Sequence, residues 1–152
     1  MESWLLENGY PALLLLSFLA STLLPLGSEW LLAVLLINHF DPSLVVSVAA
    51  LGNTAGAVTT YAIGLWGGPY LVRRVLRISR DSQHRAERYF NRYVSWALLF
   101  SWLPLLGDPL CLASGVLKTG FWRFVLLVAL GKSLRYLVVA KLVMQSVNQG
   151  LS

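Results

Sequence analysis

The chain has 152 residues, of which 57% are apolar and 12% are charged, and its mean hydropathy is +0.65. A soluble domain of this size needs more charge to cover its surface, so the composition indicates a membrane protein. The formal net charge of +5 comes from residues 73–92, and a basic segment between apolar runs is typical of a cytoplasmic loop rather than of a nucleic-acid-binding surface.

Residues 10–37 form the first long apolar run, which is interrupted near its middle by Pro25, Gly27 and Glu29. The run is too short for two spans of about 20 residues each. It is therefore either one kinked span or a re-entrant hairpin that turns at the break and returns to the side it entered from. Irregular backbone at that depth is tolerated only against protein or a water-filled cavity.

Residues 44–66 form the second apolar run, whose length suits one membrane crossing. Small residues recur every four positions on one helical face, and this spacing allows another helix to approach closely. The alternative is that they are scattered small residues of an ordinary membrane helix. The face can serve a partner within the chain or a second copy, so a homo-oligomer is left open. The packing residues are Gly52, Gly56, Thr60 and Gly64.

Residues 67–93 are predicted to be a basic linker that leaves the apolar core. An arginine face and an apolar face at helical spacing favour an amphipathic helix on the membrane surface, and a solvated loop is the alternative. Asp81 is expected to cap the start of this helix. The basic face carries Arg85, Arg88 and Arg92, and the apolar face carries Ala86, Tyr89, Phe90 and Tyr93.

Residues 94–117 repeat the pattern of the first run, with a second break that ends in an acid. Residues 121–147 then form a final long crossing with Lys132 and Arg135 well inside it. The second break contains Pro104, Gly107, Asp108 and Pro109.

The two breaks recur at a constant offset of 79 in residue number, which relates Pro25 to Pro104 and Glu29 to Asp108. This recurrence predicts an all-α polytopic membrane protein, a single membrane domain over residues 1–152. Each of two units is a re-entrant broken hairpin followed by a transmembrane helix. The units are residues 10–66 and 94–147, joined by the basic cytoplasmic linker 67–93. One crossing between them would invert the second unit, a pattern typical of transporters.

Four ionisable residues are expected within the membrane, namely Glu29, Asp108, Lys132 and Arg135. Each is costly in hydrocarbon unless it is paired or hydrated. Lys132 and Arg135 are three residues apart and share a helical face. The hypothesis is that the two acids face these cations across a polar groove and bind or transport a substrate there. Static salt bridges that only hold the helices together are the alternative.

No catalytic arrangement is evident in the sequence. The serines have no plausible histidine partner, since His39 and His84 fall in predicted loops. No phosphate-binding glycine loop and no cluster of metal ligands is found, and the single cysteine excludes an internal disulfide. The sequence therefore predicts no enzyme, no cofactor and no metal site.

The ordered motifs resemble those of the DedA family, also called the VTT-domain or SNARE-associated family. The resemblance rests on the break at Pro25–Glu29, the run Gly52-Asn53-x-x-Gly56-x4-Tyr61-x-x-Gly64 and the break at Pro104–Asp108. The later run Gly131-Lys132-Ser133-Leu134-Arg135-Tyr136 is similar to that of the short YqaA-like branch. Together these motifs cover roughly residues 20–145.

The resemblance implies a multi-pass protein of the bacterial inner membrane with two facing re-entrant hairpins. It also implies movement of lipids, such as undecaprenyl phosphate or phospholipids, between leaflets, and Glu29 matches the family's acid in the first hairpin. Many relatives carry two arginines around the second proline, in a pattern like Phe-x-Arg-Phe-x-Pro-x-x-Arg. Here that stretch is Phe100-Ser101-Trp102-Leu103-Pro104-Leu105-Leu106-Gly107, without arginine, so Lys132 or Arg135 would have to supply the cation.

The leading hypothesis is therefore a flippase or scramblase for an anionic lipid with a phosphate headgroup. Lys132 or Arg135 would bind the phosphate, and Glu29 and Asp108 would act as counter-ions or proton carriers. One alternative is a small proton- or cation-coupled transporter that uses the same carboxylates for a soluble solute. Another is a membrane partner protein that transports nothing and docks through its arginine-rich helix.

Overall fold

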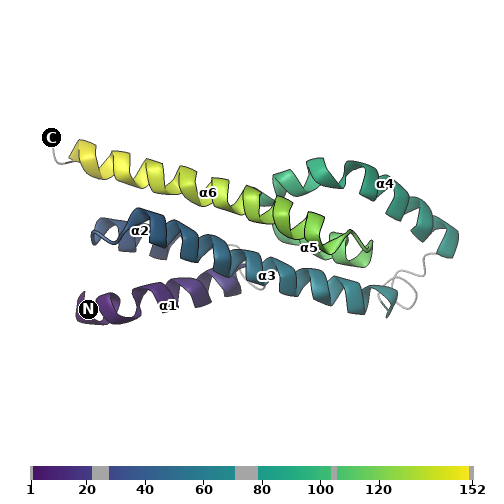
Figure 1. The fold of residues 1–152 in the computed structure, drawn as a ribbon, viewed down its shortest axis with the longest axis horizontal. Coiled ribbons are helices and arrows are strands. Elements are labelled where there is room, and N and C mark those ends of the chain that lie inside the picture. The colour runs from purple at the N-terminus through teal and green to yellow at the C-terminus, as the bar shows by residue number, and fades with distance from the viewer. Residues whose placement is uncertain (1, 22–27, 71–78, 104–105, 151–152) are drawn as a thin grey trace. The chain divides into compact units, whose positions relative to one another are not determined.

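The computed structural model describes residues 2–21, 28–70, 79–103 and 106–150 (Figure 1). All regular structure within these ranges is helical, which confirms the predicted all-α class. The elements are α1 (Glu2–Ala20), α2 (Ser28–Ile37), α3 (Pro42–Tyr70), α4 (Arg80–Leu99), the 3-10 helix η2 (Phe100–Trp102), α5 (Gly107–Val116) and α6 (Phe121–Gly150).

The two predicted breaks fall between helices of this order. Pro25, Gly27 and Pro104 lie outside the described residues, as do the first three arginines of the basic segment. Gly107 is the first residue of α5, and Pro109 lies in its first turn. At 10 residues each, α2 and α5 would reach only about 15 Å, which is half the thickness of a bilayer core.

The helix bounds recur at the offset seen in the sequence. Both ends of α5 are related to those of α2 by this offset, and so is the start of α6 to that of α3. The bounds of α4 match those of α1 to within one position when shifted in the same way. The order of a long, a short and a long helix is therefore repeated, and α4 is the counterpart of α1, although the sequence predicts a linker over residues 67–93.

The turns after the two short helices also match. His39 and Lys118, which are related by the same offset, adopt positive φ angles of 61° and 54°. In each turn the next residue's N–H bonds the carbonyl five residues earlier, at 3.1 Å after His39 and 2.9 Å after Lys118. This left-handed ending satisfies carbonyls at a helix C-terminus. Glycine is its usual marker, so neither ending could be recognised from its residue type.

The start of α3 is fixed by two adjacent residues. Asp41 Oδ1 accepts hydrogen bonds from the backbone N–H groups of Ser43 at 2.8 Å and Leu44 at 3.2 Å. Pro42 occupies the first helical position, where its missing N–H costs nothing. Together they begin the long helix at Pro42.

The start of α4 corrects one expectation. Ser79, not Asp81, caps the helix, and its hydroxyl accepts a hydrogen bond from the N–H of Ser82. Asp81 lies inside the first turn, where its carboxylate still faces the positive end of the helix dipole. The helix continues to Leu99, so the described part of the basic segment and the first arm of the second broken run are one element.

The faces of α4 also differ from the expected pair. Val94 and Leu98 are fully buried and Phe90 is half-buried, so this stripe packs against the protein. Tyr89 and Tyr93 remain 71% and 55% exposed. The predicted apolar face is therefore divided, because Phe90 turns inward while the two tyrosines turn outward.

The chain divides into two compact units, Met1–Gly56 with Lys132–Ser152 as unit 1 and Ala57–Gly131 as unit 2. Unit 1 holds α1, α2, the first half of α3 and the second half of α6. Unit 2 holds α4, α5, the first half of α6 and the second half of α3. Each unit thus combines one long–short helix pair with complementary halves of the two longest helices.

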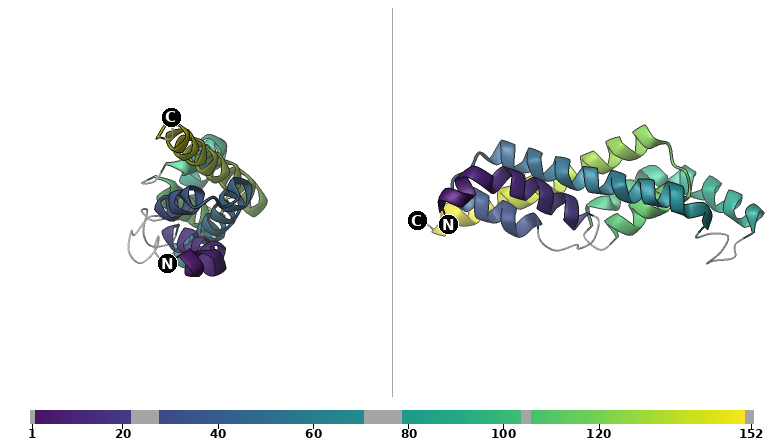
Figure 2. Two further views of the ribbon diagram at one scale, coloured as in Figure 1. Left: turned by 90° about the vertical axis from the view of Figure 1, so that its left-hand side faces the viewer. Right: turned by 90° about the horizontal axis from the view of Figure 1, so that it is seen from below.

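Each unit has its own apolar core. In unit 1, α1, α2 and the yellow end of α6 pack around the first half of α3 (Figures 1 and 2). Fully buried core positions of α2 and α3 correspond at the repeat offset to those of α5 and α6, so these helices use the same face in both halves, whereas the buried positions of α1 and α4 differ. The corresponding pairs are Leu32 and Cys111, Val45 and Phe124, and Ala49 and Val128.

The small residues of α3 lie at close backbone contacts within each unit. In unit 1, a Cβ atom at Gly52 or Gly56 would lie 2.5 Å from the carbonyl oxygen of Leu14 or Phe18, respectively. In unit 2, a Cβ atom at Gly64 would overlap a carbonyl of α5. Thr60, the fourth member of the predicted set, is half-buried.

Among the described residues, the segment Pro42–Gly68 of α3 is long and apolar enough to cross a membrane, judged by length and composition.

Candidate functional site

A cluster of buried polar side chains lies inside unit 1, where α1, α2, α3 and α6 meet. Burial of such groups is costly unless they are hydrogen-bonded, so a cluster of them requires an internal network. The members are at most 4% exposed: Ser17, Ser21, Ser28, Asn53 and Lys132.

Lys132 is the charged member of this cluster and is only 3% exposed. Its ammonium group donates hydrogen bonds to Ser21 Oγ, at 2.9 Å, and to Asn53 Oδ1. Both acceptors are neutral oxygens, one from the residue that follows α1 and one from α3. The cation is therefore held by oriented dipoles of two other segments, which fixes its position in the interior of the unit.

The second half of the network is built on the fully buried Tyr136. Asn53 Nδ2 donates to the Tyr136 hydroxyl at 2.9 Å, and this hydroxyl shares a hydrogen bond of 2.8 Å with Ser28 Oγ. Asn53 thus uses its amide oxygen toward Lys132 and its amide nitrogen toward Tyr136. A continuous chain of hydrogen bonds runs from Ser21 through these residues to Ser28.

Glu29 and Arg135 form an ion pair, and each of them is adjacent in sequence to a member of this hydrogen-bond chain. Glu29 is in the first turn of α2, directly after Ser28, and Arg135 precedes Tyr136 on α6. The side chains are 26% and 17% exposed, respectively, so the pair is half-buried and still reachable. Charge-assisted bonds of this kind are about twice as strong as neutral ones.

The four predicted site residues are thus placed as follows. Glu29 and Arg135 pair directly, and Lys132 lies one helical turn before Arg135 within unit 1. The described bonds of Lys132 go to Ser21 and Asn53. Asp108 belongs to unit 2, where it is half-buried in the first turn of α5. A groove shared by both acids stays a prediction.

Four members of the network are not among the site residues predicted from the sequence, namely Ser21, Ser28, Asn53 and Tyr136. Asn53 and Tyr136 were noted only as parts of motifs. One signal could have found Asn53, since it precedes Lys132 by the repeat offset of 79. Tyr136 lies four residues after Lys132 and so shares its helical face.

Unit 2 contains a smaller polar contact around Tyr61 of α3. Its hydroxyl donates to the backbone carbonyl of Thr119, and its ring stacks on Phe124 with centroids 4.5 Å apart. Gly115 lies against the Tyr61 backbone, where a Cβ atom would overlap the carbonyl oxygen. This tyrosine therefore fixes the turn between α5 and α6.

Residues 24–145 match the VTT domain. The chain is 35% identical over 130 residues to the inner membrane protein YqaA of Escherichia coli strain K12, covering 85% of this chain and 87% of that protein. It is 32% identical over 131 residues to an uncharacterized protein of Haemophilus influenzae, covering 81% and 80%. A membrane protein of Bacillus subtilis, YkoX, is 29% identical over 111 residues, covering 69% and 48%.

No solved structure matches the chain. The VTT match contains Glu29, Asp108, Lys132 and Arg135, so all four predicted site residues lie within the shared domain. The resemblance drawn from the two breaks and the glycine run is confirmed. The chain belongs to the VTT-domain family, also called DedA, and is a protein of the bacterial inner membrane.

Proposed function

We propose that this protein is a flippase- or scramblase-like transporter that moves an anionic, phosphate-headgroup lipid between the leaflets of the inner membrane and so contributes to membrane homeostasis. One observation carries the proposal: the Glu29–Arg135 pair is half-buried, still partly exposed, and adjacent in sequence to a buried hydrogen-bond chain that holds Lys132. Ionisable groups at this depth in membrane proteins usually mark a transport pathway.

The proposal includes a multi-pass topology in which the second half of the chain is inverted relative to the first. Its support is the recurrence of helix bounds and turns at one offset. The hydrogen bond between Asn53 and Lys132 adds a geometric reason, because residues related by a twofold pseudo-axis can contact each other only close to that axis. Transporters built from inverted repeats bind substrate near such an axis.

Arg135 is the group proposed to bind the lipid phosphate. Its planar guanidinium matches the geometry of a phosphate and can bond it in a bidentate way. Glu29 already occupies this guanidinium, so an entering headgroup would have to displace the carboxylate. That exchange keeps the cation neutralised when the site is empty and keeps substrate binding weak enough for release.

Lys132 and Asp108 have different proposed roles. Lys132, buried and bonded to Asn53, would supply positive potential behind Arg135 without direct contact with the lipid. Asp108 corresponds to Glu29 at the repeat offset, and we assign it the same counter-ion role in the second half. Either acid would serve as the proton carrier if movement is proton-coupled.

The test is a leaflet-exchange assay with the full chain in vesicles that contain fluorescent phosphatidylglycerol. We expect exchange above that of empty vesicles for the wild type and strongly reduced exchange for Arg135→Ala and Glu29→Gln. Arg123→Ala and Glu7→Gln are matched controls, because both residues are exposed. No exchange of any anionic lipid above empty vesicles would contradict the proposal.

The same assay separates transport from a purely structural ion pair. If Arg135→Ala and Glu29→Gln are folded but inactive, the pair acts in transport. If both variants fail to fold, the pair serves only to stabilise the packing of the helices.

The continuous hydrogen-bond chain from Ser21 to Ser28 is the observation that favours a second candidate, a proton-coupled solute transporter. Ion-driven uptake into sealed vesicles that is independent of lipid composition would favour that candidate.

A further inference from the structure

Helix α4 and the first residue of η2 carry an exposed aromatic stripe that the core of unit 2 does not use. Its members are separated by four, three and four residues, so they line one side of the helix. A contiguous exposed apolar stripe of this kind marks an interaction surface. The members and their exposed fractions are Tyr89 71%, Tyr93 55%, Trp96 69% and Phe100 53%.

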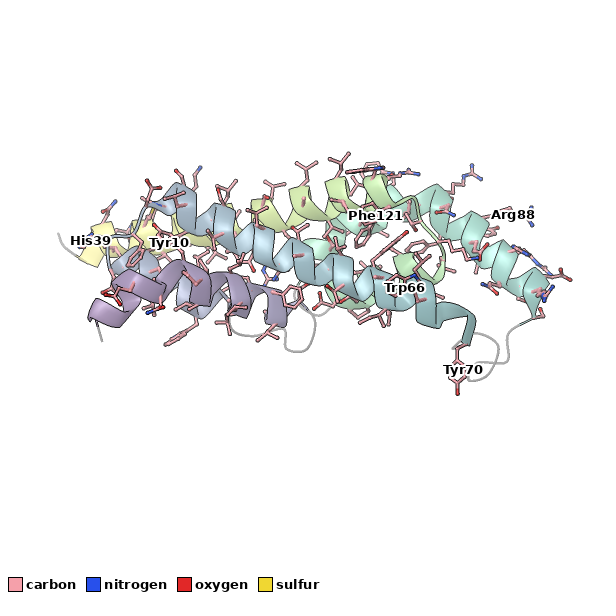
Figure 3. The ribbon with its side chains drawn as sticks, turned by 60° about the horizontal axis from the view of Figure 1, so that its bottom comes forward. Tyr10, His39, Trp66, Tyr70, Arg88 and Phe121 are labelled. Carbon is pink, nitrogen blue, oxygen red and sulfur yellow. The ribbon has the colours of Figure 1, made fainter. Side chains whose placement is uncertain are left out.

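An arginine stripe lies next to these rings. Arg85, Arg88, Tyr89 and Arg92 line a shallow hollow of about 350 Å³ on the outside of α4. Arg88 points away from the helix in Figure 3. The residues that line the hollow include no acid. Glu87, the nearest acid in sequence, is bonded instead to Gln83 and His84.

The charged residues of α4 end at one position along the helix. Arg92 is its last charged residue, and no charged residue occurs from Tyr93 to Leu103. Tryptophan and tyrosine gather where a membrane protein passes from headgroups to hydrocarbon, and Tyr93 and Trp96 directly follow this change. Arg85, Arg88 and Arg92 would then lie within about two helical turns outside the hydrocarbon, at the depth of lipid phosphates.

Other parts of unit 2 expose aromatic rings in the same manner. Trp66 is 81% exposed and Tyr70 is 64% exposed at the end of α3, and Trp122 is 76% exposed at the start of α6. Figure 3 shows Trp66 and Tyr70 on this part of α3. The rings of unit 2 therefore occur at several helix ends, as in the aromatic belt of a membrane protein.

We propose that the outer face of α4 is a binding surface for the phosphate headgroups of anionic lipids in the leaflet on the arginine-rich, cytoplasmic side. Arginine bonds phosphate in a bidentate way, and each basic residue near an anionic leaflet adds to the attraction. The rings that follow Arg92, on Tyr93, Trp96 and Phe100, enter the upper hydrocarbon and hold the helix at that depth. A membrane fits both stripes at once, whereas an acidic soluble protein would satisfy only the arginines.

This surface is distinct from the Glu29–Arg135 pair, which belongs to unit 1. It requires lipid binding at equilibrium and no transport, so it stands whether or not the proposed flippase activity is found. It would concentrate anionic lipid beside the protein, and it sets the depth of α4 by phosphate contacts as well as by burial of rings.

The test uses the full chain in nanodiscs, with a fluorophore on Asn91→Cys in a Cys111→Ala background. Asn91 is exposed on α4, whereas Cys111 is fully buried. Quenching is compared between phosphatidylglycerol and phosphatidylcholine that are spin-labelled close to the headgroup. We expect stronger quenching by phosphatidylglycerol, with local enrichment of roughly fivefold for each arginine that reaches the surface. Raising the salt concentration should reduce this preference.

Three comparisons make the result specific. Arg85→Gln/Arg88→Gln/Arg92→Gln should remove the preference, while the corresponding triple lysine variant should retain part of it. Arg80→Gln/Lys118→Gln/Lys141→Gln loses the same net charge from other exposed positions and should retain the preference. A fluorophore on the exposed Ser43→Cys measures the background.

Two results would overturn the proposal. One is equal quenching by the two lipids in the wild type, and the other is a preference that survives the triple glutamine substitution. Capture of an acidic protein without any lipid preference would assign the face to a protein partner and overturn it as well. Because the three arginines are exposed, the glutamine variant should elute as the wild type does, and the lysine variant provides a second check.

Discussion

Lys132 donates a hydrogen bond to Asn53, which occupies the equivalent position in the other repeat. The first residues of α3 and α6 are related by the offset of 79, and so are Asn53 and Lys132. Asn53 therefore lies as far into α3 as Lys132 lies into α6. Two lysines meeting at such a position would repel each other. An amide facing an ammonium group gives it an acceptor and leaves the amide nitrogen for Tyr136, so the departure from strict repetition satisfies both groups.

Replacement of Asn53 should show how strongly the buried cation depends on it. We expect Asn53→Leu to lower the free energy of unfolding by about 3 kcal/mol, because a buried charged donor loses an acceptor. The double variant Asn53→Leu/Lys132→Met should recover much of that loss, since an apolar pair leaves no polar group unsatisfied. Unfolding of purified protein in detergent, followed by near-UV circular dichroism, measures both. Wild-type stability of Asn53→Leu would show that the bond contributes little.

Tyr136 should be sensitive to loss of a single oxygen atom. Its hydroxyl joins Asn53 to Ser28, and all three side chains are buried. Tyr136→Phe should therefore destabilise the protein by about 1–3 kcal/mol, measured by the same unfolding assay. Tyr70→Phe makes the matched change on an exposed ring and should leave stability unchanged. Equal effects of the two substitutions would contradict a structural role for the network.

Close packing of α3 against α1 gives a third prediction. A Cβ atom at Gly56 would lie 2.5 Å from the Phe18 carbonyl oxygen, whereas one at Gly67 would meet nothing within 4 Å. Gly56→Ala should thus cost about 1–3 kcal/mol through overpacking, as measured by the same unfolding assay. Gly67→Ala, on the same helix, should be neutral or stabilising by about 0.5–1 kcal/mol because alanine favours helix. A neutral Gly56→Ala would mean that α1 can move away without penalty.

The sequence predicted the helical class and the offset at which the helix bounds recur, because these depend on composition and spacing, and the ionisable residues that it singled out include Glu29, Lys132 and Arg135. Asn53 was seen only as a motif member, since a lone amide in an apolar helix has no sign of its partner until the helices pack. The cap of α4 was assigned to Asp81 because acids and serines are both common caps, and local geometry chose Ser79. The non-glycine endings at His39 and Lys118 carry no sequence signal at all.

Those two endings offer a direct test of the inverted topology. If the halves of the chain are inverted, His39 and Lys118 must face opposite sides of the membrane, although the turns that hold them have the same hydrogen bonds. Both residues are exposed and already place a side chain at positive φ, so His39→Cys and Lys118→Cys should preserve the fold.

An impermeant maleimide, applied to intact cells and then to inverted vesicles in a Cys111→Ala background, reports the side of each cysteine. We expect His39→Cys to react from the periplasm and Lys118→Cys from the cytoplasm, which is the side assigned to the arginines. Reaction of both from one side would make the two halves parallel. The contact between Asn53 and Lys132 would then have to arise without a twofold pseudo-axis in the membrane plane. Glu29 and Asp108 could then not face each other as the opposing halves of one site.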